Sequence, residues 1–393
     1  MRSSADVVIA GGGCMGCSVA WHLAQLGITN VVLLEREAQL ATGSTGKNAG
    51  GFRHQFSNSA NIELSIESIA LMKDFERIVG TPIDFHQDGY LFLLSKSSNL
   101  ETFKRNIALQ QRHGVDVRWV TNDEARELSP GLDLAGVKGA TYCPSDGVAD
   151  PNGVTMGFAK GAQALGVEIV RECEVTGARL NGHRLTEVRT SKGDISTSIL
   201  INAAGPSAKS IGRLLGVDVP VEPERRHIFI ASPSGGGSWD EARNAGRVPK
   251  SKILVIDFES TFYFHREGGG LLFGMGDPDE RAGFDITVRW DFLPKVIEVA
   301  MQRLPALSDA AVSHAWAGLY EMTPDHNPII GPSSDVDGFF TIAGFSGHGF
   351  QHAPAAGRIL ADLVAGQDPR FDVKPFSLDR FAQRVTRGEG NVV

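Results

Sequence analysis

The sequence lacks a long uninterrupted apolar run, although its first forty residues come close to one. Residues 7–34 carry no Asp, Glu, Lys or Arg. The glycines at 11–13, together with Gln25 and Asn30, interrupt every 18-residue apolar segment, and Asp6 stands where a signal peptide carries basic residues. We therefore expect no membrane span and no secretion signal, and we predict a cytoplasmic protein.

Cysteine is scarce, with four residues in a chain of 393. Four scattered cysteines are too few for a disulfide framework in a chain of this size. Cys14 and Cys17 form a C-x-x-C motif, but both lie inside a glycine loop and no second ligand pair accompanies them. We interpret them as small residues that pack a helix, with a redox or zinc pair as the alternative. No other cluster has metal-ligand spacing, so we predict no metal.

An excess of basic charge is also absent, because the net charge is -8. A general nucleic-acid binder carries a basic face, so the sequence argues against that class. The hydrophobic fraction of 42% and the charged fraction of 21% are ordinary for a globular protein, and 393 residues allow two or three cores. Glycine is abundant and falls in short groups, which indicates loops where backbone approaches a ligand.

The N-terminal region carries the strongest local pattern. Residues 6–10, DVVIA, predict a short buried strand, and the glycine-rich GGGCMG of 11–16 follows. An amphipathic helix then ends at Gly27, and a second buried strand at 31–34 precedes Glu35. In a dinucleotide-binding turn the glycines permit the turn, the approach of the pyrophosphate and helix packing, and the acid accepts hydrogen bonds from ribose. The alternative is a glycine-rich turn of an unrelated α/β fold.

The rest of the chain repeats strand–loop–helix units with β-rich insertions between them. Periodicity predicts helices at 62–79, 98–113, 123–128, 153–165, 291–304 and 353–365, and strands at 83–95, 167–190, 199–206 and 338–343. Units at the start, middle and end of the chain indicate a discontinuous nucleotide domain with a second domain threaded through it. We therefore predict a mixed α/β fold.

A second glycine-rich stretch, ATGSTGKNAGGFRHQFS at 41–57, ends in a single basic residue, Arg53. The small residues leave backbone bare, and the planar guanidinium suits a carboxylate better than a point charge does. We therefore predict that Arg53 binds a substrate carboxylate. The alternative is a surface arginine, or one that pairs with Glu63 or Glu67.

The N-terminal pattern and four later segments occur in the order that is typical of the FAD-dependent D-amino-acid oxidase superfamily. Within this superfamily the chain resembles most the branch of sarcosine oxidase β-subunits and glycine/sarcosine oxidases. The segments are ATGSTGKNAGG at 41–51, INAAGPSA at 201–208, MTPDHNPIIGP at 322–332 and AGFSGHGFQHAPAAG at 343–357. The resemblance spans nearly the whole chain. It implies FAD, a discontinuous Rossmann-like FAD-binding domain and a substrate domain built on a mainly antiparallel β-sheet.

The resemblance also implies boundaries and cofactor contacts. The expected FAD-binding segments are 1–82, 147–216 and 323–393, and the expected substrate-domain segments are 83–146 and 217–322. In the resembling family two glycine loops, here residues 42–51 and 344–351, lie along the flavin, and the helix after the second loop points its N-terminus toward it. The expected cofactor-binding residues are Gly11, Gly13, Cys14, Met15, Gly16, Glu35, Arg36, Thr42, Gly43, Ser44, Thr45, Asn48, Ala49, Gly50, Gly51, Val175, Ala204, Gly205, Gly318, Gly344, Gly347, His348, Gly349, Phe350 and Gln351.

The sequence departs from its relatives at several positions. Gly318 and Lys47 stand where members of the superfamily carry a Cys or a His for covalent flavin attachment, and residues 150–154 lack the His that holds a second flavin. We therefore expect one noncovalent FAD. Relatives carry a Lys that assists the carboxylate at the position of Gln351, and a Lys linked to oxygen reactivity near the position of Leu272. This chain lacks both lysines, so we predict either an oxidase or a dehydrogenase that uses another electron acceptor.

Catalytic candidates besides Arg53 and Gln351 are aromatic or imidazole side chains. Tyr320 lies at a pocket-aromatic position of the family, with core packing as the alternative. Residues 262–266, FYFHR, predict a strand that alternates aromatic and polar side chains, on which Tyr263 or His265 lines either the substrate site or an exposed sheet face. His348 is expected to shape the flavin loop, because an amine that binds neutral needs no base.

Together these features predict the FAD-dependent oxidation of a small, secondary or N-methyl amino acid such as sarcosine to its imine. A hydride passes to flavin N5, and the electrons pass to oxygen or another carrier. The expected partners are a small carboxylated amine and an electron acceptor, and a homo- or hetero-oligomer is left open. The alternatives are a 2-hydroxy acid dehydrogenase of the same superfamily and a noncatalytic FAD-carrying subunit.

Overall fold

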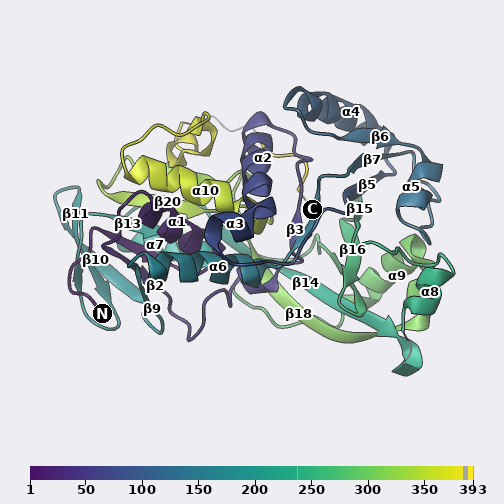
Figure 1. Ribbon diagram of the computed structural model, residues 1–393, viewed down its shortest axis with the longest axis horizontal. Helices are drawn as coiled ribbons and strands as arrows, with labels where there is room; N and C mark the ends of the chain where they lie inside the picture. The colour runs from purple at the N-terminus through teal and green to yellow at the C-terminus, as the bar shows by residue number, and fades with distance from the viewer. Residues whose placement is uncertain (237, 384–387, 393) are drawn as a thin grey trace.

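The computed structural model describes residues 1–236, 238–383 and 388–392. Two large sheets organise this part of the chain, and the polypeptide passes repeatedly from one to the other (Figure 1). No helix among the described residues combines the length and the apolar composition that a membrane crossing requires.

The first sheet has six strands in the order β19-β20-β13-β1-β2-β9, parallel except for β19. Its strands are β1 (Val7–Ala10), β2 (Val31–Leu34), β9 (Glu168–Val170), β13 (Leu200–Asn202), β19 (Ile329–Pro332) and β20 (Phe339–Ala343). These strands come from the start, the middle and the end of the chain. The sheet is therefore assembled from separated segments, as the repeated strand–loop–helix units predict.

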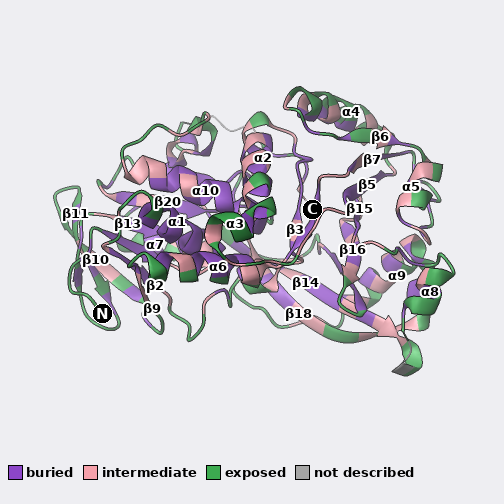
Figure 2. Ribbon diagram, in the orientation of Figure 1, coloured by how far each residue is buried: buried purple, intermediate pink, exposed green. Residues whose placement is uncertain are grey.

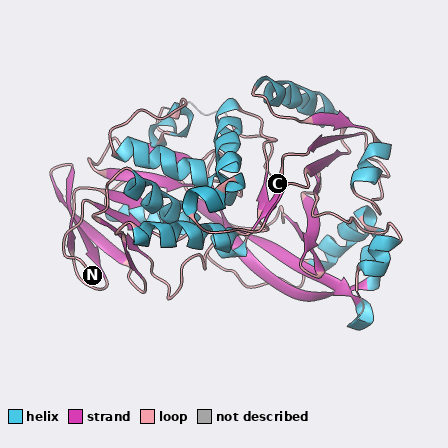
Figure 3. Ribbon diagram, viewed as in Figure 1, coloured by secondary structure: helices cyan, strands magenta, loops and turns pink. Residues whose placement is uncertain are grey.

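Both faces of this sheet are buried, which is why its strands are almost wholly apolar. On one face Val7 and Ile9 pack in a core with residues of α1 (Cys14–Gln25), α6 (Pro151–Ala164) and α10 (Gly349–Val364). Val8 and Ala10 point to the opposite face, where they join a core with residues of the hairpin β10 (Val175–Asn181) and β11 (Arg184–Thr190), and of α7 (Ala208–Leu214). Figure 3 shows the helices gathered beside these strands.

The second sheet has eight strands in the order β18-β14-β17-β16-β15-β5-β7-β6, antiparallel except for the β15–β5 pair. Its strands are β5 (Tyr90–Leu94), β6 (Arg118–Val120), β7 (Gly139–Cys143), β14 (Glu222–Pro233), β15 (Leu254–Asp257), β16 (Phe262–Glu267), β17 (Gly270–Met275) and β18 (Ala310–Met322). One face packs on α9 (Leu293–Arg303) around Phe229, Phe264 and Phe273. The predicted mixed α/β class is confirmed, whereas the exact domain boundaries stay a prediction.

Smaller elements complete the fold. They are β3 (Gly51–Phe52), β4 (Phe85–His86), β8 (Gly147–Ala149) and β12 (Ile195–Ser196), with the helices α2 (Ser59–Lys73), α3 (Phe75–Val79), α4 (Ser97–Arg112), α5 (Asn122–Leu128) and α8 (Asp240–Asn244). Figure 2 shows that exposed residues gather on the outer helices α4, α5 and α8, while the strands are mainly buried.

Two predicted elements are each split in the structure. The helix expected at 62–79 is α2 and α3, separated by Asp74 with non-helical angles of φ -102° and ψ 18°. The strand expected at 83–95 is β4 and β5, because Gly89 adopts φ 90° between them and donates its N–H to the carbonyl of Asp146 at 2.8 Å.

The last long helix begins four residues earlier than the predicted start at 353 and contains Pro354. A proline inside a helix removes one backbone hydrogen bond and costs about 3 kcal/mol in an exposed helix. Here the Ser68 hydroxyl lies beside the break, where it donates to the carbonyl of His352 at 3.2 Å and accepts from the N–H of Ala355 at 3.1 Å. Contacts with α2 therefore stabilise a turn that local propensity disfavours.

Candidate active site

A cavity of about 1050 Å³ is lined by residues of both large sheets. Its walls include the N-terminal turn of α1, the loop after β2, both glycine loops and one face of the eight-stranded sheet. This volume suits a large ligand rather than a single amino acid, since pockets for drug-sized ligands measure about 300–1,000 Å³.

Two glycines make the β1–α1 turn possible. Gly11 has φ 117°, and a Cβ there would lie 2.3 Å from the carbonyl oxygen of Ala203. A Cβ on Gly16 would lie 1.9 Å from the carbonyl oxygen of Gly11, so α1 packs closely on the turn only because Gly16 has no side chain. The positive end of α1 consequently faces the cavity with bare backbone, an arrangement that favours phosphate.

Glu35 is held at the end of β2 by backbone donors. One of its carboxylate oxygens accepts from the N–H of Gly12 at 2.8 Å, and the other accepts from the N–H of Glu37 at 2.9 Å. The carboxylate lines the cavity at this fixed position. It is therefore placed to accept from a hydroxyl of a ligand that extends from α1 along the end of β2.

The first glycine loop, residues 42–51, is tied to the turn and to the second sheet. The Thr45 hydroxyl accepts from the N–H of Cys14 at 3.1 Å, and the Ser44 hydroxyl donates to the carbonyl of Leu319 at 2.6 Å. At the end of the loop, a Cβ on Gly51 would lie 1.8 Å from the hydroxyl oxygen of Tyr90. The loop thus runs along the cavity wall with no room for larger residues at this point.

One face of the eight-stranded sheet forms the opposite wall. Tyr90 on β5, Tyr263 on β16, Arg226 on β14 and Tyr320 on β18 all line the cavity. Arg226 and Tyr320 share a face because Arg226 pairs with Gly318, and Tyr320 lies two residues after Gly318 on the same strand. The Arg226 guanidinium lies over the ring of Tyr320, 4.9 Å from its centroid.

Arg53 follows β3 and is 6% exposed, so it is not a surface residue. Its N–H donates to the side-chain oxygen of Gln351 at 2.5 Å, and its Nη1 donates to the carbonyl of Gln55 at 2.6 Å. Its Nη2 donates to the carbonyl of Asn391, and the guanidinium lies 4.1 Å from the ring centroid of Phe56. Burial lowers the pKa of the guanidinium, and an arginine stays charged even so.

The alternative that Arg53 pairs with Glu63 or Glu67 is wrong. Glu63 lies 3.5 Å from the imidazole of His113, and Glu67 pairs with Arg358. The hydrogen bonds of the Arg53 guanidinium go instead to backbone carbonyls, which leave its charge available to a ligand carboxylate.

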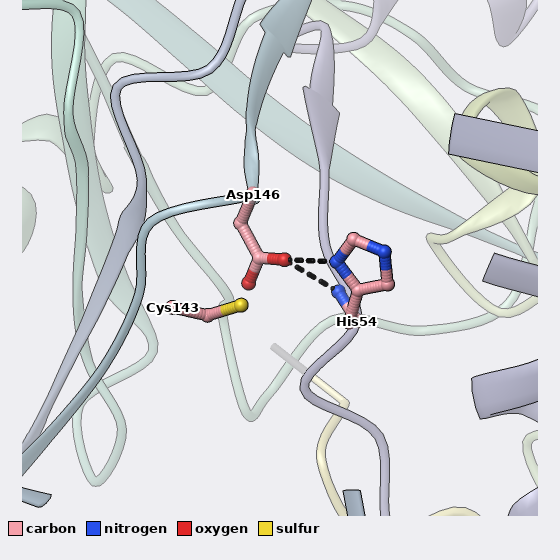
Figure 4. A group of neighbouring side chains, drawn as sticks. All are labelled: His54, Cys143 and Asp146. Atoms are coloured by element: carbon pink, nitrogen blue, oxygen red, sulfur yellow. Dashed lines mark hydrogen bonds and ion pairs between the residues drawn. The ribbon is translucent and has the colours of Figure 1, made fainter. Parts of the chain in front are cut away.

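Next to Arg53 in the chain, His54 forms a buried group with Cys143 and Asp146 (Figure 4). One oxygen of Asp146 accepts from the backbone N–H of His54 at 2.7 Å and lies 2.7 Å from its Nδ1, and the other oxygen accepts from Nε2 of Gln55 at 3.0 Å. These are hydrogen-bond distances, and the shared oxygen already has two partners. We therefore interpret the group as a brace for residues 54 and 55, which follow Arg53, rather than as a metal centre.

Most predicted site residues come together around the cavity. The lining residues among them are Gly11, Gly13, Cys14, Met15, Glu35, Arg36, Thr42, Gly43, Ser44, Thr45, Asn48, Ala49, Gly51, Arg53, Val175, Ala204, Gly205, Tyr263, Gly318, Tyr320, Gly347, His348, Gly349, Phe350 and Gln351. Their individual contacts with a cofactor stay predictions. Cys14 and Cys17 are buried free thiols, and burial raises the pKa of Cys14 to about 11, so neither is a reactive thiolate.

Four predicted residues lie behind the wall instead. Gly16, Gly50 and Gly344 pack closely against Gly11, Ala149 and Thr323, respectively. His265 is buried within β16, and its ring nitrogens lie 2.8 Å and 3.0 Å from the carbonyls of Arg266 and Ala49. Its side chain lies on the same face of β16 as that of Tyr263, but farther along the strand, where the ring faces the carbonyl of Ala49 in the first glycine loop and does not line the cavity.

Several lining residues carried no clear sequence signal. Tyr90 lies within an apolar strand, Arg226 lies within the basic run 225–227, and Val392 lies near the end of the chain. Glu321 is partly exposed to the cavity that it lines, and burial raises its pKa to about 7 although the N–H of Gly344 donates to it at 2.9 Å. These residues could be found only once the sheet register and the tail position were known.

Comparisons with known proteins agree with this geometry. A protein-family model described as DAO, FAD dependent oxidoreductase, matches residues 6–363. Mitochondrial sarcosine dehydrogenase from Mus musculus is 29% identical over 98% of this chain, and dimethylglycine dehydrogenase from Rattus norvegicus is 28% identical over 98%. The chain covers only 42% and 46% of these two relatives, which is less than half of each. FAD-dependent oxidoreductase domain-containing protein 1 from Xenopus laevis is 32% identical, over 99% of this chain and 85% of the relative.

Solved structures show the same fold. L-proline dehydrogenase from P. horikoshii superposes with a TM-score of 0.90 at 32% identity, covering 98% of this chain and all of the other. Glycine oxidase from Bacillus cereus superposes with a TM-score of 0.78 at 25% identity, covering 93% of this chain and 96% of the other.

Proposed function

The chain belongs to the FAD dependent oxidoreductase family, and from this premise we propose that it oxidises a small secondary or N-methyl amino acid to its imine. The observation that carries the proposal is the position of Arg53. A buried guanidinium held by neutral carbonyls lines the same cavity as the glycine turn and the two glycine loops. A carboxylate is the ligand group that this planar cation binds best.

The residues present fit FAD. The glycine turn and the start of α1 would hold the pyrophosphate, Glu35 would accept from the adenosine ribose, and the two glycine loops leave room for the ring system. When bound, FAD supplies an isoalloxazine that accepts a hydride equivalent from the substrate. Gly318 has no side chain to form a bond, which supports noncovalent attachment.

The chain's own residues then bind and orient the substrate. Arg53 takes the carboxylate in its fork, while Tyr90, Tyr263 and Tyr320 close the sheet side of the pocket and exclude water. Because the charge at one end is fixed, the Cα and the amine are presented in one orientation. The imine that leaves the pocket is hydrolysed by water.

Anaerobic reduction of the bound flavin tests this function. We expect loss of the oxidised flavin absorbance when the protein meets sarcosine or proline, and no loss with pyrrolidine, which is proline without its carboxylate. Reoxidation by oxygen or by an artificial acceptor then separates an oxidase from a dehydrogenase. Reduction by pyrrolidine as fast as by proline would refute the role of the carboxylate, and no reduction by any carboxylated amine would refute the function.

One observation favours a second candidate, the oxidation of a 2-hydroxy acid. His348 lines the cavity, and its buried Nε2 has no hydrogen-bond partner among the described residues. Burial holds the pKa of this imidazole well below its usual value, so it is neutral and able to accept a proton from an alcohol. If lactate but not amines reduces the flavin, and His348→Asn abolishes the reduction by lactate, this second candidate is favoured. Bound flavin that no compound reduces, with a co-purifying chain, would indicate a noncatalytic subunit.

The electron acceptor, the oligomeric state and the cytoplasmic location stay predictions. The names of the relatives include dehydrogenases and an oxidase subunit, which supports a small amino acid and an electron acceptor as partners.

A further inference from the structure

We propose that residues 388–392, here called the strap, form part of the substrate site: they hold the Arg53 guanidinium in one orientation and limit the space beside it. The inference rests on the proposed function, because it concerns how the same site binds a carboxylate. Neither composition nor periodicity distinguishes these residues, which lie about 340 positions from Arg53 along the chain.

The strap is anchored by a buried carboxylate. Glu389 is 2% exposed and accepts from the N–H of Ser57 at 2.9 Å, from its hydroxyl at 2.6 Å and from Nδ2 of Asn58 at 2.7 Å. Nδ2 of Asn61 adds a further hydrogen bond at 3.1 Å. Hydrogen bonds to an ionised group are stronger than neutral ones, so this cluster fixes the strap at the start of α2.

Backbone contacts continue the anchoring on both sides of Glu389. Its own N–H donates to the carbonyl of Asp325 at 3.0 Å, and the N–H of Gly390 donates to the Ser57 hydroxyl at 2.8 Å. The strap therefore joins the loop between β18 and β19 to the segment that follows Arg53.

Asn391 connects the strap to Arg53 directly. Its carbonyl accepts from Nη2 of Arg53, its Nδ2 donates to the carbonyl of Gln55 at 3.0 Å, and its Oδ1 accepts from Nδ2 of Asn106 at 3.3 Å. The carbonyl of Gln55 is also the acceptor for Nη1 of Arg53. The carbonyls of Gln55 and Asn391 thus hold two guanidinium nitrogens, and the Asn391 side chain fixes the first of these carbonyls relative to the second.

This arrangement orients the arginine through neutral carbonyls, while the Glu389 carboxylate of the strap acts to raise the pKa of the guanidinium, against the lowering by burial. A guanidinium has five N–H donors, and the two hydrogen bonds to carbonyls leave three for a ligand. A carboxylate that arrives meets a fork whose side-chain torsions are already fixed, which reduces the entropy lost on binding. Asn391 is accordingly a positioning residue, because it acts through Arg53.

Val392 gives the strap a second role. Val392 lines the cavity together with Arg53 and Tyr90, and its backbone neighbour Asn391 contacts Arg53. Because the substrate carboxylate is held at Arg53, the group next to that carboxylate lies near Val392. The size of residue 392 should then decide how large a ring or α-substituent the site accepts.

Asn391→Ala tests the positioning role in the flavin-loaded protein. We expect the KM for the amino acid that reduces the wild-type flavin to rise about tenfold with kcat within about twofold, because the two side-chain hydrogen bonds that fix the Asn391 carbonyl beside Arg53 are lost. The dissociation constant of acetate, read from the flavin absorbance without turnover, should rise by the same factor. Asn244→Ala, an exposed substitution on α8, is the matched control.

An unchanged acetate affinity in Asn391→Ala, with normal flavin content and Tm, would overturn the inference. Where Asn391→Ala lowers flavin content or Tm, the variants Val392→Ala and Val392→Phe decide, because they leave the hydrogen bonds of Glu389 and Asn391 in place. We expect Val392→Ala to raise kcat/KM for pipecolate relative to proline at least threefold, and Val392→Phe to lower it. An unchanged ratio in both variants would overturn the inference as well. If no carboxylated amine reduces the wild-type flavin, the proposed function fails, while the acetate affinities still decide whether the strap positions Arg53.

Discussion

The side-chain oxygen of Gln351 accepts a hydrogen bond from the backbone N–H of Arg53 at 2.5 Å. Gln351 lies in the first turn of α10, and Arg53 lies two residues after the first glycine loop, so this contact links the end of the second glycine loop to the segment that follows the first, at the point where the predicted carboxylate site begins. The resemblance placed Gln351 where relatives carry a lysine that assists the carboxylate. In this chain the residue holds the backbone of the arginine.

Gln351→Ala should therefore weaken substrate binding through Arg53. Removing the acceptor leaves the Arg53 N–H buried and unpaired, which costs about 1–3 kcal/mol, part of it recovered when the loop shifts. We expect a rise in KM of about three- to tenfold and a smaller change in kcat, measured by steady-state kinetics with an artificial electron acceptor. Gln367→Ala, at an exposed position beyond α10, serves as the control, and a Gln351→Ala variant with wild-type KM would contradict the role.

Arg53→Lys separates the planar fork from the charge. Lysine keeps a positive charge but loses the paired donors and the contact with the ring of Phe56. Charge-assisted hydrogen bonds contribute about 1.5–3 kcal/mol, so KM should rise about 10- to 100-fold, with bound flavin retained. Arg105→Lys on α4 is the matched exposed substitution. Equal KM values for wild type and Arg53→Lys would show that the carboxylate binds elsewhere.

Gly16→Ala should abolish most flavin binding. The added Cβ would lie 1.9 Å from the carbonyl oxygen of Gly11, so α1 must move away from the turn that would hold the pyrophosphate. We expect less than about a tenth of the wild-type flavin-to-protein absorbance ratio, because small displacements at a preorganised phosphate site lose several hydrogen bonds together. Gly269→Ala, where no atom lies within 4 Å of the added Cβ, should keep the wild-type ratio. Full flavin content in Gly16→Ala would contradict the packing argument.

Asp146→Asn should destabilise the hydrogen-bonded group in which Asp146 holds His54 and Gln55, the two residues after Arg53. The amide of the asparagine would direct a donor toward the N–H of His54 or Nε2 of Gln55, where two donors then meet. A buried unsatisfied donor costs about 1–3 kcal/mol, which lowers Tm by several degrees in a chain of this size. Differential scanning fluorimetry of the flavin-loaded protein measures this change, with the exposed Asp123→Asn on α5 as control. A metal bound at His54, Cys143 and Asp146, detected by elemental analysis, would show that these residues form a metal centre and not a brace.

The sequence predicts the parts of the site that local chemistry determines. The turn at Gly11, the acid at Glu35 and the buried position after the first glycine loop all follow from short segments whose residue types have one physical use. The pairing of Arg226 with Gly318, and hence the place of Arg226 on the cavity wall, depends on the register between two long strands. The contact of Asn391 with Arg53 depends on where the end of the chain packs, and no local pattern encodes it. Alternation along residues 262–266 places Tyr263 and His265 on one face of the strand, but it does not show that His265 is buried against the carbonyl of Ala49 and so neither lines the cavity nor lies on an exposed sheet face.

Glu321 should make stability depend on pH in the direction opposite to that of a paired carboxylate. Burial raises its pKa from 4.5 to about 7 in the folded chain, while the unfolded chain keeps the ordinary value. Between these two pH values the folded state binds more protons than the unfolded state, so this group's contribution to stability falls as pH rises from about 4.5 to about 7 and levels off above that.

Glu321→Gln removes this dependence and keeps an oxygen that accepts from the N–H of Gly344. The difference in Tm between the variant and the wild type should therefore be small near pH 5 and should grow to a few degrees in favour of the variant near pH 8, because the rise in pKa corresponds to about 3 kcal/mol and each kcal/mol shifts the Tm of a chain of this size by about 1–2 °C. Thermal melts of the flavin-loaded proteins across this range measure it, with the exposed Glu298→Gln on α9 as the control. A Tm difference that does not change with pH would show that Glu321 is already ionised in the folded protein at pH 5.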